Sequence, residues 1–526
     1  QLNFKANRVA AGFHARGLHH GDCVALLVES SPEALFAILG LNKIGVIASL
    51  INTQLTGDAL AHVLRSCRPV VVIADGEHLP AVIETLSVLV GEGLSPELLC
   101  ADGDHVGAPS LQATLPTNAV TPASTLLQHA NDVMLYLYTS GTTGLPKAAL
   151  IRNRRFLTAA HGFGVISQAS RDDVIYLTMP LYHATGMIAA LGTALVSGAA
   201  LALRRKFSAR EFWADCVRYE ATLFNYIGEI CRYLLAAPAH PLERQHRLRA
   251  AMGAGMRADI WTRFQERFGV PRIIEFYGAT EGNIALLNLE NKPGMMGRLM
   301  PGQALVRINE ETEEFLRDSK GHLIRAGAGE KGILVGRITA ATRFDGYLDT
   351  SRNQDKVLRD PFGNGSDYFN SGDLAELHPG RWVSFADRLG DTYRWKGENI
   401  STVEVSNLLN GCAGVLESTV YGVTVPGCDG RAGMAVIVTQ PEFAIHALAQ
   451  DVFSKLPEHL RPVFLRLQGE IATTASFKYV KTTLQKDGFD PSTLSDALFV
   501  IDAASRSYQL LDTEAHAAIV SGQRRL

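Results

Sequence analysis

The chain has 526 residues, of which 47% are apolar and 20% are charged. That length is too great for one ordinary domain, and the composition is typical of a folded protein with a large core. The 50 Lys and Arg nearly balance the 53 Asp and Glu, so the net charge of −3 argues against a nucleic-acid partner. Seven scattered cysteines without a Cys-x-x-Cys pair indicate reduced thiols in a cytoplasmic protein.

The N-terminal region resembles the middle of an amphipathic helix. Residues 1–20 carry apolar side chains at helical spacing, show no signal peptide and do not begin with Met, so we expect a preceding segment that this sequence lacks. The stretch 186–203 comes closest to a membrane span, but Gly, Ser and Thr interrupt it. It favours a buried helix, turn and strand, and the alternative is a surface for peripheral contact with the inner membrane face.

Strand-like and helix-like segments alternate along the chain, which predicts an α/β fold with largely parallel sheets. Gly, Pro, Ser and Thr mark 101–124 as a loop. Near 387–400, a predicted strand gives way to a new helix, so we expect a large domain at 1–388 and a small α+β domain at 389–526. The predicted strands are 24–30, 70–75, 173–180, 221–227 and 272–278, and the first helix between them is 32–45.

The clearest chemical motif lies at 135–147, LYLYTSGTTGLPK. An apolar run ends in small and hydroxylated residues, which let backbone N–H groups approach phosphate oxygens, and a lysine adds charge. It is not the Walker pattern, because Ala148 follows the lysine. The predicted phosphate loop consists of Thr139, Ser140, Gly141, Thr142, Thr143, Gly144 and Lys147.

A second glycine-rich segment, AMGAGMRA at 251–258, fits Gly-x-Gly-x-x-Ala, with Glu275 lying 20 residues after Gly255. Taken alone, this pattern is compatible with a dinucleotide fold. Because a phosphate-binding motif already lies upstream, the preferred interpretation is a turn that walls an adenine pocket, where a side chain would block the base.

Two acidic motifs complete a nucleotide site. FYGATEGN at 276–283 offers a flat ring, a close backbone approach, and a hydroxyl beside a carboxylate, which is a group that suits Mg²⁺ shared with nucleotide phosphates. The residues concerned are Tyr277, Gly278, Thr280 and Glu281. In SGDL at 371–374, Asp373 is predicted to follow a tight Gly turn and to accept hydrogen bonds from ribose hydroxyls.

In this order, TSGTTGLPK, YGATEG, SGDL and DRLGD–GENI resemble the adenylate-forming superfamily of acyl-CoA synthetases, peptide-synthetase adenylation domains and luciferases. The resemblance covers essentially the whole chain. Other segments resemble the fatty acid transport protein / very-long-chain acyl-CoA synthetase branch, which also contains bile-acid CoA ligases. Those segments are YIGEICRYLL (226–235), FYGATEGN (276–283), DRLGDTYRWKGENISTVEV (387–405), VPGCDGRAGMAV (425–436) and TASFKYVK (474–481).

The resemblance implies a large N-terminal domain of stacked sheets and helices, a small mobile C-terminal domain, and the use of ATP, Mg²⁺ and coenzyme A. It also implies a role for each matching residue. The phosphate loop would bind the β- and γ-phosphates, and Glu281 would hold Mg²⁺. Gly253, Ala254 and Gly255 would line the adenine with Tyr277 stacking on it, and Asp373 and Arg388 would bind ribose. His183 would stand beside the substrate carboxylate, Lys478 would bridge carboxylate and phosphate, and Gly397 would lie near the pantetheine tunnel.

The sequence departs from the branch near the implied catalytic lysine. Ala475 and Ser476 stand where the branch has Gly and Thr, and Lys481 is a nearby rival to Lys478. The hinge position, commonly Asp or Lys, is Gly390.

The implied activity is a long-chain or very-long-chain fatty acid–CoA ligase that works through an acyl adenylate. The alternatives are a bile-acid or steroid CoA ligase and a fatty acid uptake protein. A domain that loads a carrier-protein thiol is disfavoured, since no carrier-like domain follows in the sequence.

Overall fold

The computed structural model divides the chain into two compact units, each described by itself below. Unit 1 comprises residues 1–300, 336–360 and 366–369, and unit 2 comprises 301–335, 361–365 and 370–526. The structure describes 1–140, 145–309, 312–388, 391–396, 398–428, 430–473 and 479–526.

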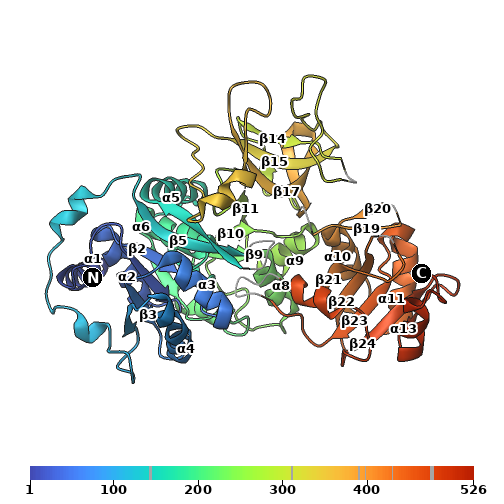
Figure 1. The fold of residues 1–526 in the computed structure, drawn as a ribbon, viewed down its shortest axis with the longest axis horizontal. Coiled ribbons are helices and arrows are strands. Elements are labelled where there is room, and N and C mark those ends of the chain that lie inside the picture. The colour runs from blue at the N-terminus through green and yellow to red at the C-terminus, as the bar shows by residue number, and fades with distance from the viewer. Residues whose placement is uncertain (141–144, 310–311, 389–390, 397, 429, 474–478) are drawn as a thin grey trace. The chain divides into compact units, whose positions relative to one another are not determined.

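Unit 1 contains two six-stranded sheets. The first has the order β4-β3-β1-β2-β5-β6 and is parallel except for β6. Strands β1, β2 and β3 are buried along their whole length, as expected of a parallel sheet with both faces covered. Figure 1 shows this part in blue and cyan. Its elements are α1 (Leu2–Ala15), β1 (Cys23–Leu27), α2 (Pro32–Lys43), β2 (Ile47–Leu50), α3 (Gly57–Cys67), β3 (Val71–Ala74), α4 (Leu79–Leu89), β4 (Glu97–Cys100), β5 (Val133–Ser140) and β6 (Pro146–Arg152).

The second sheet of unit 1 has the order β12-β11-β10-β9-β7-β8, and only β12 is antiparallel. One of its faces packs on an aromatic cluster in which Phe212, Phe224 and Phe264 are all buried. Its elements are α5 (Asn153–Ser167), β7 (Val174–Leu177), the π-helix η4 (Thr185–Gly192), α6 (Thr193–Ser197), β8 (Ala200–Leu203), α7 (Phe212–Arg218), β9 (Leu223–Ile227), α8 (Gly228–Ala236), β10 (Ala250–Ala254), α9 (Ala258–Phe268), β11 (Ile273–Gly278) and β12 (Ala285–Asn288).

Three further elements of unit 1 are short: β13 (Gly297–Arg298), the 3₁₀ helix η5 (Thr350–Lys356) and β16 (Val357–Leu358). The segment just before η5 lies against β6. Leu150 N–H donates to Gly346 O at 3.0 Å, and Leu348 N–H donates to Ala148 O at 2.9 Å. These bonds bring 345–356 close to the predicted phosphate loop.

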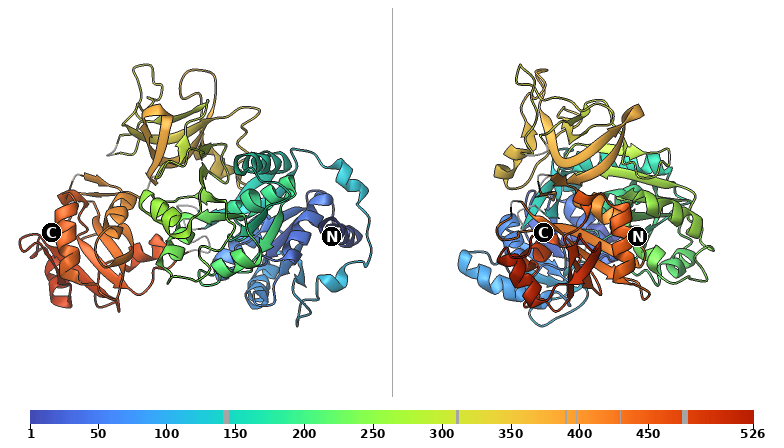
Figure 2. Two further views of the ribbon diagram at one scale, coloured as in Figure 1. Left: turned by 180° about the vertical axis from the view of Figure 1, so that it is seen from behind. Right: turned by 90° about the vertical axis from the view of Figure 1, so that its right-hand side faces the viewer.

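Unit 2 contains an antiparallel pair, β17 and β18, and a five-stranded sheet in the order β21-β22-β23-β24-β25. That sheet and its helices, red in Figure 2, enclose a core that includes Val436, Phe464 and Val500. The elements are β14 (Gln303–Val306), β15 (Lys331–Arg337), β17 (Tyr368–His378), β18 (Trp382–Arg388), β19 (Tyr393–Trp395), β20 (Glu398–Ile400), α10 (Thr402–Asn410), β21 (Val415–Val423), β22 (Ala432–Thr439), α11 (Ile445–Lys455), β23 (Phe464–Gln468), α12 (Lys481–Asp487), β24 (Ala497–Asp502), β25 (Ser507–Leu510) and α13 (Thr513–Val520).

The α/β fold class and each predicted strand are confirmed, within a few residues at the ends. The apolar stretch 186–203 is the predicted helix, turn and strand, namely η4 with α6, a turn at Gly198 (φ +77°), and β8. Within the described ranges, no helix is both long enough and apolar enough to span a membrane. The largely parallel sheets lie in unit 1. The α+β character expected of 389–526 agrees with β21 and β22, which form a long antiparallel pair.

Candidate active site

In the sequence, the predicted phosphate loop runs from the end of β5 to the start of β6, an antiparallel pair that we call the phosphate hairpin. β5 runs into it and β6 leads out of it, and Thr139 lies opposite Lys147 in the antiparallel register. The hairpin therefore fixes the lysine beside the entrance of the loop. Gly141, Thr142, Thr143 and Gly144 lie outside the described residues, and for Ser140 only the backbone is described.

The other unit 1 motifs meet at one edge of the second sheet. β7, β9, β10 and β11 are neighbours and run parallel, so their carboxyl ends share an edge. The residues at or just after these ends include His183, Gly228, Gly253–Gly255 and Tyr277–Glu281. In open α/β sheets, ligands bind outside this edge. The fold thus brings together four segments that lie far apart in the sequence.

The glycines of this edge are required by close backbone packing. A Cβ on Gly253 would lie 2.0 Å from Tyr226 O, and one on Gly228 would lie 1.9 Å from Gly255 O. Gly255 has φ +81°, which a side chain rarely tolerates. The carbonyl of the adjacent strand by itself excludes a side chain at Gly253, and the expectation that a side chain there would block the base stays a prediction.

Glu275 does not match the dinucleotide alternative. Its side chain is buried, with 4% of the residue exposed, and it accepts hydrogen bonds from the Tyr226 hydroxyl, from Gly255 N–H, and from Met256 N–H at 3.2 Å. In a dinucleotide site this acid would face a ribose. Here the carboxyl group fixes the turn at the end of β10.

Glu281 lies on a tight turn after β11. Gly282 N–H donates to Ala279 O at 3.2 Å, which closes the turn around Thr280 and Glu281. The Glu281 carboxylate is 12% exposed and lies 3.9 Å from Lys356 Nζ. A partly shielded carboxylate beside a hydroxyl suits Mg²⁺, which binds to one or two carboxylates plus substrate phosphates.

Lys147 and Glu281 share one electrostatic environment. Burial lowers the pKa of Lys147, the nearby cations Arg352 and Lys356 lower it further, and Glu281 and Asp355 oppose the change. Sequence reasoning missed the three η5 residues. The only available signal was the density of charged side chains in TSRNQDK, which does not reveal that the helix docks beside the hairpin.

His183 follows β7, as the PLYHATG motif predicts. Its ring lies 5.0 Å from that of Tyr182, measured between centroids. Its backbone carbonyl accepts from Met187 N–H at 2.8 Å, which fixes the residue to the start of η4. The histidine thus stands at the ligand-binding edge of the sheet.

In unit 2, Asp373 on β17 and Arg388 on β18 are direct partners in the antiparallel register, so the fold brings the two predicted ribose residues together. The predicted tight turn at SGDL is wrong, because β17 runs through it, with Gly372 at φ +77°. Asn370 Oδ1 accepts from Gly372 N–H at 3.0 Å and holds this irregularity. Gly390, Gly397 and Lys478 lie outside the described residues.

The family model described as AMP-binding enzyme matches residues 1–333. The chain belongs to the AMP-binding enzyme family. It is 41% identical to long-chain fatty acid transport protein 1 of Mus musculus over 99% of this chain and 83% of that protein. It is 40% identical to long-chain fatty acid transport protein 3 of Homo sapiens over 97% and 76%. These matches place this AMP-binding enzyme among the long-chain fatty acid transport proteins, the branch that the motifs predict.

Solved structures confirm the fold of this AMP-binding enzyme. ATP-bound MatB from Rhodopseudomonas palustris aligns with a TM-score of 0.77 at 23% identity, covering 92% of both chains. A fatty acyl CoA synthetase of Mycobacterium tuberculosis aligns with a TM-score of 0.64 at 22% identity, covering 92% of this chain and 91% of that one. The adenylate-forming fold implied by the motifs is therefore confirmed.

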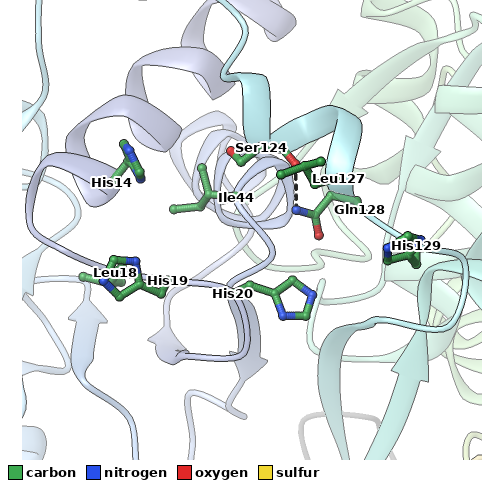
Figure 3. Close-up of a pocket in the computed structure, with 9 residues that line it drawn as sticks. All are labelled: His14, Leu18, His19, His20, Ile44, Ser124, Leu127, Gln128 and His129. Atoms are coloured by element: carbon green, nitrogen blue, oxygen red, sulfur yellow. Dashed lines mark hydrogen bonds between the residues drawn. The ribbon is translucent and has the colours of Figure 1, made fainter.

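A cavity of about 360 Å³ lies elsewhere in unit 1 (Figure 3). Its lining contains four histidines together with Leu18, Ile44, Leu127 and two polar residues, and none of these is a predicted site residue. The histidines are His14, His19, His20 and His129.

Glu275 is expected to make the stability of this enzyme depend on pH. Burial raises its pKa from 4.5 to about 8, while Tyr226 and two backbone N–H groups oppose the rise. Between these values the unfolded chain releases a proton that the folded protein keeps, so the free energy of unfolding falls as pH rises. The loss reaches as much as about 5 kcal/mol, at about 1.4 kcal/mol per pH unit.

Glu275→Gln keeps the shape of the side chain and cannot ionise. Denaturant unfolding at pH 5 and pH 8 is expected to show a clearly smaller decrease for this variant than for the wild type. Equal decreases would mean that Glu275 is ionised in the folded protein.

Proposed function

We propose that this AMP-binding enzyme joins a long-chain or very-long-chain fatty acid to coenzyme A through an acyl adenylate, with release of AMP and pyrophosphate. The observation that carries the proposal is the shared environment of Lys147 and Glu281, at the tip of the phosphate hairpin and the edge of the second sheet. The names of its relatives, long-chain fatty acid transport proteins, support a long acyl chain as the substrate.

In the first half-reaction, a carboxylate oxygen bonds to the α-phosphorus and the bond to pyrophosphate breaks. The carboxylate is already a nucleophile, so the protein has to align the reactants and balance charge. Lys147 would neutralise the leaving pyrophosphate, and Lys478 would bridge carboxylate and α-phosphate. His183 would orient the acid, and the glycines at 253–255 with Tyr277 would hold the adenine.

Glu281 and Thr280 would hold Mg²⁺ against the nucleotide phosphates. When bound, the metal supplies charge neutralisation at the phosphates. Lys356 already lies beside the Glu281 carboxylate, so a cation is accommodated at this position.

In the second half-reaction, the thiol sulfur of coenzyme A bonds to the acyl carbon, the bond to AMP breaks, and the thiol proton is lost. Gly397 would lie near the pantetheine arm, and Asp373 with Arg388 would bind the ribose of the nucleotide. The proposal includes a cytoplasmic enzyme with peripheral membrane contact, and a C-terminal domain at 389–526 that turns about Gly390 between the two half-reactions.

The deciding experiment measures AMP formation from ATP, Mg²⁺ and coenzyme A with acids that range from acetate to very long chains, and with cholate-type acids. We expect long-chain acids to give the highest kcat/KM. A preference for cholate-type acids would replace the proposal with a bile-acid ligase. Saturable fatty acid binding without AMP release would leave an uptake or binding protein.

Lys147→Ala is expected to raise the barrier to adenylation by roughly 1.5–3 kcal/mol, the scale of a hydrogen bond to a charged group. The lysine would lose its contact with the phosphates while the hairpin register remains. The measurement is ATP-dependent acyl-adenylate formation, with Lys43→Ala as a control at the end of α2, outside every predicted motif. If Lys147→Ala has the same ATP kinetics as the wild type, Lys147 does not bind the nucleotide.

A further inference from the structure

Arg155 lies in the first turn of α5, three residues after β6 ends. The same strand carries Lys147 at its other end, so β6 and α5 form one continuous segment from the phosphate hairpin to Arg155. No sequence pattern singles out this arginine, because it stands among several basic residues in IRNRRF.

The Arg155 guanidinium contacts the turn that carries Glu281. Its Nη2 donates to Ala279 O at 2.8 Å. The same carbonyl accepts from Gly282 N–H and so closes the turn. Arg155 therefore binds the atom on which the turn depends, and Glu281 is the third residue of that turn.

The last residue of the turn, Gly282, is packed against an aromatic ring. A Cβ on Gly282 would lie 2.3 Å from the ring of Phe369, so the ring lies directly against the turn. Phe369 in turn packs on Phe344, with 5.2 Å between ring centroids. The turn is therefore held at its first residue by the guanidinium and at its last by the ring, with Glu281 between these two contacts.

The guanidinium lies close to two carboxylates but is only partly satisfied by hydrogen bonds. Burial lowers the pKa of Arg155, and the carboxylates of Asp345 and Glu281 oppose the change. Asp345 is 4% exposed and lies 3.2 Å from Arg152 Nε. Arg155 Nη1 and Asp345 Oδ2 are both buried without a hydrogen-bond partner among the described residues. The residue as a whole is half-buried, so the unpaired Nη1 adds a cost in stability, and the contact with Ala279 is better explained by position than by stability.

We propose that Arg155 is a positioning residue for adenylation, which holds the turn at 279–282 so that the Glu281 carboxylate faces the phosphate hairpin. The inference rests on the proposed function, in which Glu281 holds the metal of the nucleotide. Arg155 touches neither nucleotide nor acid, and it acts through the Ala279 carbonyl. A displacement of about 1 Å in a catalytic group can cost roughly 100-fold in rate.

The test uses Arg155→Met, Arg155→Lys and the control Arg154→Met in the full chain. Arg154 is adjacent on α5, and its Nη2 lies 3.8 Å from Asp345 Oδ1. Three readouts are compared: acyl-adenylate formation over a range of Mg²⁺, Mn²⁺ affinity by electron paramagnetic resonance with a non-hydrolysable ATP analogue, and thioester formation from synthetic acyl adenylate.

For Arg155→Met we expect a loss of roughly 10- to 100-fold in adenylation, a higher Mg²⁺ requirement and weaker Mn²⁺ binding, with thioester formation near the wild-type rate. Arg155→Lys keeps one donor and is expected to recover part of the loss, and Arg154→Met should resemble the wild type. If Arg155→Met does not fold, Arg155→Lys with an intermediate Mn²⁺ affinity carries the test.

Two results would overturn the inference. One is wild-type Mn²⁺ affinity and Mg²⁺ dependence in both Arg155 variants. The other is an equal loss in both half-reactions that follows a lowered melting temperature, which indicates a structural role alone. If the wild-type protein forms no adenylate with any acid, the proposed function fails, whereas weaker Mn²⁺ binding in Arg155→Met than in Arg154→Met still supports a positioning role and equal binding still overturns it.

Discussion

Glu281→Gln is expected to lower acyl-adenylate formation by about 100-fold or more, although the protein folds normally. Gln keeps the length of the side chain but removes the negative charge that Mg²⁺ requires of a ligand. Loss of metal-assisted charge stabilisation is worth several kcal/mol in the transition state. The side chain is 12% exposed and paired with Lys356, so removing the charge also leaves that lysine without its carboxylate.

The measurement is adenylate formation against Mg²⁺ concentration, and high Mg²⁺ is expected to restore part of the activity. Asp355→Asn is the matched control, because Asp355 is another carboxylate in the electrostatic environment of Lys147. Full activity of Glu281→Gln at ordinary Mg²⁺, with a defect in Asp355→Asn, would show that Asp355 in η5 binds the metal and that Glu281 does not.

The fold of unit 1 could be predicted because its strands are continuous apolar runs. VALLVES and VVVIAD correspond to β1 and β3, in which every side chain is buried. A strand buried in this way is a continuous apolar run, which can be recognised without knowing its partner strands. β2 was missed because its four residues, IASL, lie between a helix and a polar loop. β6 was missed because PKAALIR reads equally well as the start of a helix until its pairing with β5 is known.

Unit 2 was harder to predict because antiparallel pairing depends on partners that lie far away in the sequence. Pro426 and Gly427 mark a turn between β21 and β22, but no local pattern specifies which residues of the two strands lie opposite each other. The turn expected at SGDL failed for the same reason. Pairing with β18 keeps Asp373 within a strand, although Gly372 has a conformation typical of turns.

The candidate site was predictable where a motif contains its own chemistry, as in TSGTTGLPK and YGATEG. It was not predictable where a residue acts through a contact made by folding. Lys356 reaches Glu281 because 345–348 pairs with β6, and Arg155 reaches Ala279 because α5 follows that strand. Neither residue stands in a distinctive pattern, so only the structure identifies them.

Lys478→Ala is expected to abolish acyl-adenylate formation while thioester formation from synthetic acyl adenylate continues near the wild-type rate. The lysine would neutralise charge between carboxylate and α-phosphate only during the first half-reaction. If the C-terminal domain then turns, the same lysine is no longer needed when the thiol attacks. The two half-reactions are measured separately, by pyrophosphate exchange and by thioester release.

Lys481→Ala is the matched control, three residues away. Lys481 Nζ donates to Thr402 Oγ1 at 2.7 Å, and burial lowers its pKa while Asp391 and Asp387 oppose the change. This amine is engaged within unit 2, so its loss should lower stability without separating the half-reactions.

Gly390→Pro should give the opposite defect to Lys478→Ala, because proline fixes φ at the proposed hinge and adenylation can survive while thioester formation fails. An equal loss of both half-reactions in a folded Lys478→Ala protein would contradict a role of the lysine in the first half-reaction alone. A selective adenylation defect in Lys481→Ala alone would instead mean that Lys481, three residues further on, bridges the carboxylate and the α-phosphate. The two-step mechanism would then still hold.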